Sequence, residues 1–413
     1  MKKFFNDKLL PFLDELSGKP WVLAMRAGLI PLTLITTIAS VFVIITSIPV
    51  PAYQNAIAAI KPYINVAGNI GMGCSAIVVT VGISTAFAKA YDLDTVTNNA
   101  IALYAFLITQ VKDGALITTY FGSKGLFLGI VVALFTTFIN YQFKSRGWTI
   151  KMPEGVPDVV VQVFQSMIAG FVVVTVIWVL TVVLGIDLNT ILTTVLSPLS
   201  GLLNSAIGVA IVVFLMCLMW CIGLHESLFY GFVYPIAEAN MAANAEAFLA
   251  GATGAAIPFV FTKAFLCFCL WLGGSGGTLG LEILLLTSKS KSLKSLGKIA
   301  APSSLFQVNE PITFGVPVVF NPILSIPYCL FPAVAAFLTY TLMDLNIIGR
   351  TIAMASAQIP PVIWAYFATG GNIPAIIWYC IEIVISVLMY LPFFKVYEAR
   401  RLKDEAEGKF EAE

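Results

Sequence analysis

Charged residues and histidine are scarce in this chain. Only 11% of its 413 residues are Asp, Glu, Lys or Arg, 59% are hydrophobic, and there is a single histidine. A soluble globular domain carries about 25% charged residues, so this composition excludes that class. The sequence predicts a membrane protein.

Sites that depend on metal ions or nucleotides are also missing. His225-Glu226 begins the zinc-protease pattern H-E-x-x-H, but Phe229 stands where the second histidine belongs. The seven cysteines lie in apolar surroundings and lack partners at zinc-site spacing. The run GGSGGTLG, residues 273–280, lacks the Lys-Ser/Thr pair of a P-loop. We therefore expect no metal and no cofactor.

Long uncharged runs are what the chain has instead. A membrane span needs roughly 20 apolar residues, and suitable runs lie at 27–49, 66–88, 125–141, 159–186 and 207–224, with a further apolar run at 372–394. About ten spans fit the whole chain when shorter pieces are included. We expect an all-α polytopic membrane protein with about ten transmembrane helices.

The two ends of the chain are polar and are expected on the cytoplasmic side. In segment 1–26, Leu9, Phe12, Leu13 and Leu16 recur at helical spacing beside acidic residues, which predicts an interfacial amphipathic helix. Basic clusters at the start, at 144–151, at 289–298 and at the end place both termini in the cytoplasm. Lipid headgroups explain these clusters, so a net charge of +1 gives no reason to expect nucleic acid. The charged tail 395–413 is too short to fold as a separate domain.

Glu310 is the only charged residue between Ile299 and Leu342. It lies in SLFQVNEPITFGVPVVFNP, residues 304–322, where three prolines prevent a continuous helix. A second break is expected near 220–235 or at the glycine run 273–280. Broken helices form substrate sites in transporters, and an ionisable residue within them is functional by default. The alternative is a structural carboxylate bonded to the free amides of its own helix.

The polar residues near these breaks suit a polyhydroxylated ligand. His225, in WCIGLHES, can donate to and accept from hydroxyls, although a packed histidine is the alternative. Apolar sugar faces stack on aromatic rings, and Trp220, Trp364 and Trp378 are candidate platforms or interfacial anchors.

Five motifs resemble one family along nearly the whole chain. NEPITFGVPVVFNP (309–322), GGSGGTLG (273–280), WCIGLHES (220–227), FGSKGLFLGIVVAL (121–134) and PEGVPDVVVQVF (153–164) are similar to the membrane subunit, enzyme IIC, of the lactose/cellobiose family of bacterial sugar phosphotransferase systems. The first string is highly specific. The chain departs from the family at Glu226-Ser227, because the family usually has Gly after the histidine.

The resemblance implies an architecture and a reaction. It implies a homodimer with a transmembrane scaffold half at 27–195, a sugar-binding transport half at 196–394 and two re-entrant hairpins. A disaccharide of the cellobiose, diacetylchitobiose or lactose type would cross the bacterial cell membrane. Its 6-hydroxyl would then meet a phosphocysteine on a separate enzyme IIB, which is served by enzyme IIA.

The family's site residues carry over to His225, Asn309 and Glu310. Glu310 is the expected catalytic residue, because a carboxylate can fix and help deprotonate the attacking hydroxyl. His225 and Asn309 would orient the sugar, and Glu226 and Trp220 are further expected contacts.

Two other classes of transporter remain open. A proton-coupled sugar symporter would use Glu310 as its proton site. A channel is disfavoured because the sequence shows no ring of like charges and no filter motif.

Overall fold

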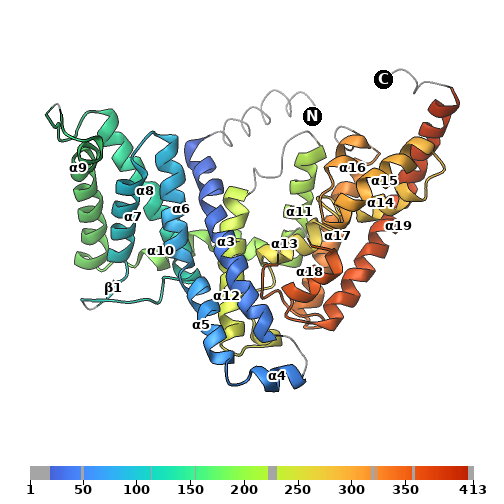
Figure 1. The fold of residues 1–413 in the computed structure, drawn as a ribbon, viewed down its shortest axis with the longest axis horizontal. Coiled ribbons are helices and arrows are strands. Elements are labelled where there is room, and N and C mark those ends of the chain that lie inside the picture. Colours follow the sequence, from blue (N-terminus) through green and yellow to red (C-terminus); the bar gives the residue numbers. More distant parts are fainter. Residues whose placement is uncertain are drawn as a thin grey trace. The chain divides into compact units, whose positions relative to one another are not determined.

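The computed structural model describes residues 19–407 except 48–50, 113, 154, 222–229, 317, 319–320, 322 and 356–358. Most of the predicted interfacial segment lies outside the described residues, as do His225 and Glu226. The regular structure of the described chain is helical apart from the antiparallel strands β1 (Val111–Lys112) and β2 (Ala115–Leu116) (Figure 1). The expectation of a mostly helical protein is confirmed.

The chain forms two compact units. Unit 1 comprises Met1–Ala39, Val66–Pro198 and Tyr230–Glu246, and unit 2 comprises Ser40–Asn65, Leu199–Phe229 and Ala247–Glu413. Unit 1 contains α6 (Ser75–Ala90), α7 (Thr95–Ile108), α8 (Leu126–Ser145) and α9 (Asp158–Trp178). Unit 2 contains α4 (Pro51–Ile57), α11 (Ala206–Cys221), α13 (Lys263–Leu270), α14 (Leu279–Leu286), α15 (Lys291–Leu305), α16 (Glu310–Gly315), α17 (Ser325–Asp344), α18 (Pro361–Ala368) and α19 (Ile373–Ala406). Residues of α3 (Pro20–Ser47), α5 (Lys61–Gly73), α10 (Leu188–Leu203) and α12 (Tyr230–Leu249) belong to both units.

Several helices are long and apolar enough to cross a membrane. Within the described residues they are Lys61–Ala90, Ser123–Ser145, Asp158–Val183, Ser325–Asp344 and Ile373–Ala406. The pair α10 and α11, bent by 83°, adds a sixth span if it counts as one. The six apolar runs read from the sequence fall mainly on helices. The count of about ten spans stays a prediction.

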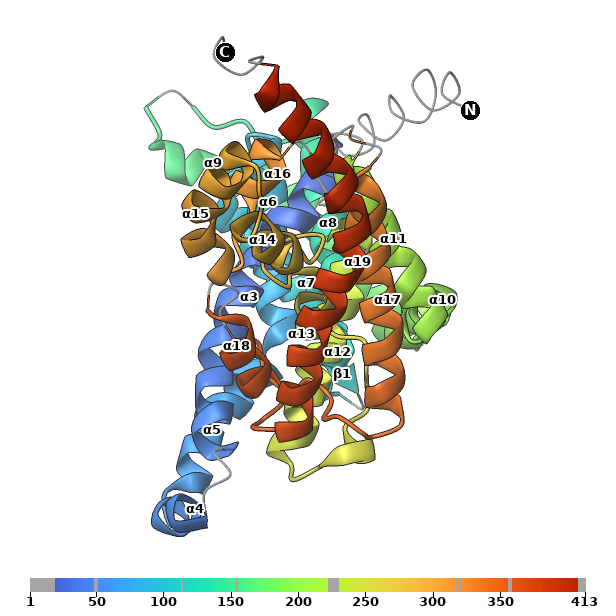
Figure 2. The same cartoon turned by 90° about the vertical axis from the view of Figure 1, so that its right-hand side faces the viewer.

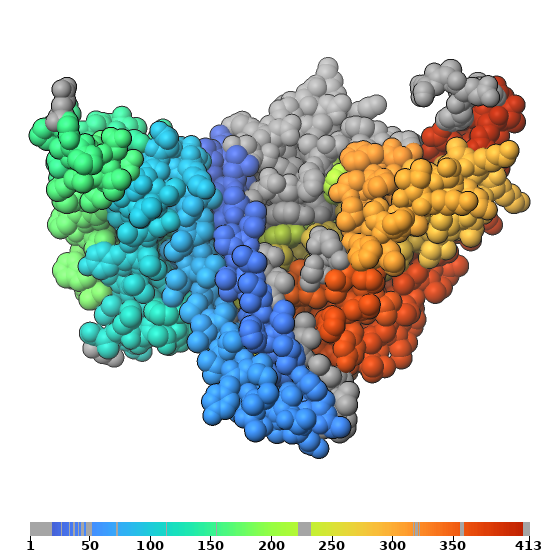
Figure 3. All heavy atoms as spheres, in the orientation of Figure 1, coloured from blue at the N-terminus to red at the C-terminus, as the bar shows by residue number. Residues whose placement is uncertain are grey.

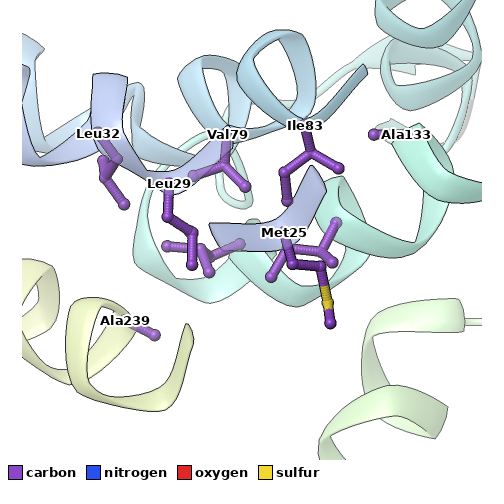
Figure 4. Close-up of a cluster of buried hydrophobic side chains, with 9 residues drawn as sticks. Met25, Leu29, Leu32, Val79, Ile83, Ala133 and Ala239 are labelled. Carbon is purple, nitrogen blue, oxygen red and sulfur yellow. The ribbon is translucent and has the colours of Figure 1, made fainter. Parts of the chain in front are cut away.

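Apolar side chains from four helices form the core of unit 1 (Figure 4). Val79 and Ile83 of α6 pack with Met25, Leu29 and Leu32 of α3, Leu126, Ile130 and Ala133 of α8, and Ala239 of α12. All nine are buried. Most lie three, four or seven residues apart within their own helix, so each helix turns one stripe toward this core.

A buried amide network ties α6, α7 and α8 together. The Asn98 Nδ2 group of α7 donates to Ser84 Oγ at 2.8 Å and to Thr137 Oγ1 at 2.8 Å. Asn140 Nδ2 donates to Asn98 Oδ1 at 3.1 Å. A polar side chain inside an apolar bundle needs such partners, and its interhelical bonds fix how the helices pack.

Replacing Asn98 by Ala is expected to lower the unfolding free energy by about 2 kcal/mol, because three interhelical bonds worth about 0.6 kcal/mol each are lost. Denaturant unfolding of the purified protein in detergent measures the change. Asn99→Ala is the matched control, since half-buried Asn99 makes a single side-chain hydrogen bond among the described residues, to Thr85 Oγ1 at 2.8 Å. Equal losses for the two variants would contradict the network's role.

Three helices of unit 2 begin at residues whose side chains cap them. At the starts of α13, α15 and α19, the side chains of Thr262, Ser290 and Asn372 accept hydrogen bonds from the backbone amides of Phe265, Leu293 and Ala375, respectively. In Figure 2, α19 runs between α17 and α14, and it packs against both. The buried aromatic rings of Phe268, Trp364 and Tyr379 fill the interior of this unit.

Candidate functional site

The chain turns sharply between α13 and α14, as the glycine run predicts. Gly273, Gly274, Gly276 and Gly277 all have positive φ, between +64° and +108°. Only glycine adopts such a series of conformations without strain. Thr278 Oγ1 closes the turn by donating to the carbonyl of Gly273 at 3.1 Å.

The second break separates α15 from α16. Helix α15 ends at Leu305, Gln307 has φ of +64°, and α16 begins at Glu310. Asn309 is 7% exposed, and its Nδ2 group donates to the carbonyl of Ser275 at 2.6 Å and to Thr278 Oγ1 at 2.8 Å. This amide brings the NEP motif and the glycine turn into direct contact, although 31 to 34 residues separate them in sequence.

Glu310 occupies a different environment from the residue before it. It is exposed, it is the first residue of α16, and Pro311 follows it in the first turn. Its carboxylate makes no hydrogen bond and no ion pair within the part of the chain that the structure describes. Among the described residues, Glu310 therefore does not act as a structural carboxylate bonded to the amides of its own helix. Glu310 is available to a ligand at a point fixed by Asn309.

The other residues predicted to contact the sugar lie in different surroundings. Trp220 is half-buried near the end of α11, and His225 and Glu226 follow in the segment outside the described residues. Trp364 is fully buried, with its ring centroid 5.9 Å from that of Phe268. Trp378 Nε1 donates to Thr339 Oγ1 at 2.8 Å. Trp364 is thus a core residue of unit 2 and does not form an open sugar platform.

Three buried carboxylates, those of Glu238, Glu282 and Glu382, were not singled out from the sequence. Glu382 is 1% exposed on α19 and accepts a hydrogen bond from the Thr339 hydroxyl of α17. Glu282 of α14 is 2% exposed, and neither of its carboxylate oxygens has a hydrogen-bond partner among the described residues. A charge inside the run 372–394 was the sequence signal for Glu382.

Replacing Gly274 by Ala is expected to weaken sugar binding at least about tenfold. A side chain at this position would be strained for two reasons. The backbone has a φ of +108°, which residues other than glycine rarely adopt, and the added Cβ would overlap the Asn309 side chain. Titration of sugar into purified protein measures the loss. Gly251→Ala is the control, since Gly251 has φ of +95° but nothing within 4 Å of an added Cβ. An equal effect at the two sites would exclude the clash with Asn309 as the cause.

Comparison with known proteins agrees with the motifs. The family model described as "Phosphotransferase system, EIIC" matches residues 26–332. The cellobiose-specific EIIC component of Geobacillus stearothermophilus is 31% identical over 98% of this chain and 95% of its own length. The lactose-specific EIICB component of Staphylococcus epidermidis is 27% identical over 98% of this chain and 72% of its own length.

The fold also matches a solved structure. The match is to the crystal structure of the transporter ChbC, the IIC component of an N,N'-diacetylchitobiose-specific phosphotransferase system. It covers 99% of this chain and 100% of the ChbC chain. The TM-score is 0.90 and the sequence identity is 29%.

Proposed function

The chain belongs to the EIIC family of the phosphotransferase system, as a sugar transporter of the cellobiose and lactose type, and from that premise we propose how it works. It binds a disaccharide, carries it across the bacterial cell membrane and presents its 6-hydroxyl to a phosphocysteine of enzyme IIB. The lactose-specific relative, named as an EIICB component, supports an enzyme IIB partner.

The contact made by Asn309 carries the proposal. Its side-chain amide joins two chain breaks, and the next residue, Glu310, presents an exposed carboxylate without a partner in the described structure. A buried positioning amide beside an exposed carboxylate is a suitable arrangement for holding one hydroxyl in a fixed direction.

Glu310 would accept the hydrogen bond of the attacking 6-hydroxyl. As the sugar oxygen bonds to phosphorus, the sulfur–phosphorus bond of the donor breaks, and the hydroxyl proton passes through Glu310 to the departing thiolate. His225, Glu226 and Trp220 would orient the sugar ring. No residue of this chain forms a covalent intermediate in this scheme.

The proposed assembly uses the two halves that the family resemblance implies. The half at 27–195 would form the dimer contact and the fixed scaffold, and the half at 196–394 would carry the sugar. The breaks at 273–278 and 306–309 would be the tips of two re-entrant hairpins, and both termini would lie in the cytoplasm. Continuous helices suit a scaffold, whereas broken helices enclose a transported ligand.

The chemical form of the product tests the function. Vesicles containing the protein are supplied with radiolabelled cellobiose, with or without phosphorylated enzyme IIB inside. Sugar phosphate inside the vesicles only when the donor is present is the expected result. Unmodified sugar accumulated by a pH gradient would instead establish the symporter, and unmodified downhill flux would establish a channel.

Replacing His225 by Ala is expected to weaken sugar affinity by about 1–3 kcal/mol, the value of one or two lost hydrogen bonds. Calorimetric titration with the same sugar measures it. Unchanged affinity would return His225 to a packing role.

A further inference from the structure

Helix α15 carries a row of lysines on its outer face. Its inner face is buried through Leu293, Gly297, Ala300 and Ser304. On the opposite face, Lys291, Lys294 and Lys298 are exposed at intervals of three and four residues, which aligns them along the helix. We call these three residues and the adjacent Ile299, which is 70% exposed, the lysine face. The segment lies on the side of the molecule drawn in Figure 3, in yellow-orange.

The positive charge of this segment exceeds the negative charge of the carboxylates that bond to it. Segment 287–298 contains four lysines and no Asp or Glu. Two glutamates of α19 accept hydrogen bonds from this segment, and their two negative charges offset only part of the charge of the four lysines. Glu398 accepts from Ser288 Oγ and from the Lys289 amide, and Glu405 accepts from the Ser290 and Ser292 hydroxyls and the Ser292 amide.

The lysines of this face, Lys291, Lys294 and Lys298, make no direct ion pair in the described structure. Exposed like charges on one helix face repel one another. A partner that supplies negative charge would relieve this repulsion and lower the electrostatic free energy of the face.

The face lies close to Glu310 along the chain. From Lys298 to the end of α15 at Leu305 is seven residues, or about 10 Å of helix, and Glu310 follows five residues later. A typical interface covers about 800 Å² on each partner, a disc of about 16 Å radius. A protein whose reactive group touches a sugar at Glu310 would therefore cover part of α15.

We propose that the lysine face docks the phosphorylated donor protein, enzyme IIB, through acidic groups around its phosphocysteine. This inference rests on the proposed function. In the sequence, the exposed apolar side chains of Ile299, Leu305 and Phe306 come after the lysines and before Glu310, with exposed fractions of 70%, 48% and 47%. Apolar groups beside a charged margin are the usual composition of a protein interface. A lipid headgroup, by contrast, has no need to sit beside the site.

The test compares two neutralised variants with equal loss of charge. The first is Lys291→Gln with Lys294→Gln, and the control is Lys89→Gln with Lys151→Gln, which removes two exposed lysines of unit 1 that form no ion pair within the described chain. Sugar phosphorylation in detergent is measured against the concentration of purified, phosphorylated cellobiose-type enzyme IIB.

The first variant is expected to raise the KM for the donor about tenfold at low salt, with kcat and sugar affinity unchanged. The difference should shrink as salt approaches about 0.5 M, because screening removes the attraction. The control should match the unmodified protein.

The same donor KM for all three proteins would overturn the docking surface. If the first variant then also bound phosphatidylglycerol vesicles more weakly, the face would be a lipid contact. Direct titration of enzyme IIB against each protein gives a readout independent of turnover. If the unmodified protein binds the donor but phosphorylates no sugar, the proposed function fails while the docking surface stands or falls on that titration.

Discussion

Replacing Glu310 by Gln is expected to reduce sugar phosphorylation at least about 100-fold while changing sugar affinity less than about threefold. Glutamine keeps the shape of the side chain and can still hydrogen-bond a hydroxyl, but it cannot take a proton. General-base catalysis contributes about 10²–10⁴ to a rate. The exposed position of Glu310 lets the substitution act on the ligand without disturbing the core.

Two assays separate these effects. Phosphorylated sugar is measured at saturating enzyme IIB, and sugar affinity is measured by calorimetry without it. Glu407→Gln is the control, because Glu407 is an exposed carboxylate that pairs with Lys403 at 3.8 Å, just past the end of α19. Full phosphorylation by the Glu310→Gln variant would leave Glu310 only a binding role.

Replacing Asn309 by Asp is expected to impair binding and phosphorylation together, by about 3 kcal/mol or more. The Asn309 amide donates to the Ser275 carbonyl and to Thr278 Oγ1, and a carboxylate cannot make the first of these bonds. It would instead place a buried charge against a carbonyl oxygen, which costs more than removal of the side chain. Asn309→Ala should therefore be the milder variant.

Sugar titration and phosphorylation assays on both variants measure the order. Asn346→Asp is the control, since Asn346 is exposed and its φ of +56° is tolerated by aspartate. If the Asn309→Asp and Asn309→Ala variants lose equally little, the contact between the two breaks does not position the site.

The helices at the six apolar runs were predictable from length and hydropathy, whereas others, such as α17 and α12, were not singled out from the sequence. The run 125–141 lies almost entirely within α8, and 159–186 covers most of α9. The breaks were also visible, because four glycines with positive φ and the prolines after Asn309 forbid continuous helix.

The contacts between segments were not predictable. Nothing in the sequence indicates that Asn309 bonds Ser275, or that Glu382 meets a hydroxyl 43 residues earlier, at Thr339. Such pairs depend on how distant segments pack, which one sequence does not encode locally. For the same reason, the sequence could not tell which tryptophans contact a ligand and which pack in the core. Only the structure shows that Trp364 is a core residue.

The length of α19 gives its polar end a mechanical role. Its 34 residues extend about 51 Å, against a hydrocarbon thickness of about 30 Å. The polar C-terminal part of α19 supports the turn between α14 and α15. Glu398 and Glu405 lie on this part and accept hydrogen bonds from serine hydroxyls and main-chain amides of the turn. A shortened chain ending at residue 394 would keep every apolar run yet leave those donors unsatisfied. The ordered contacts of the chain therefore extend well past the apolar run 372–394.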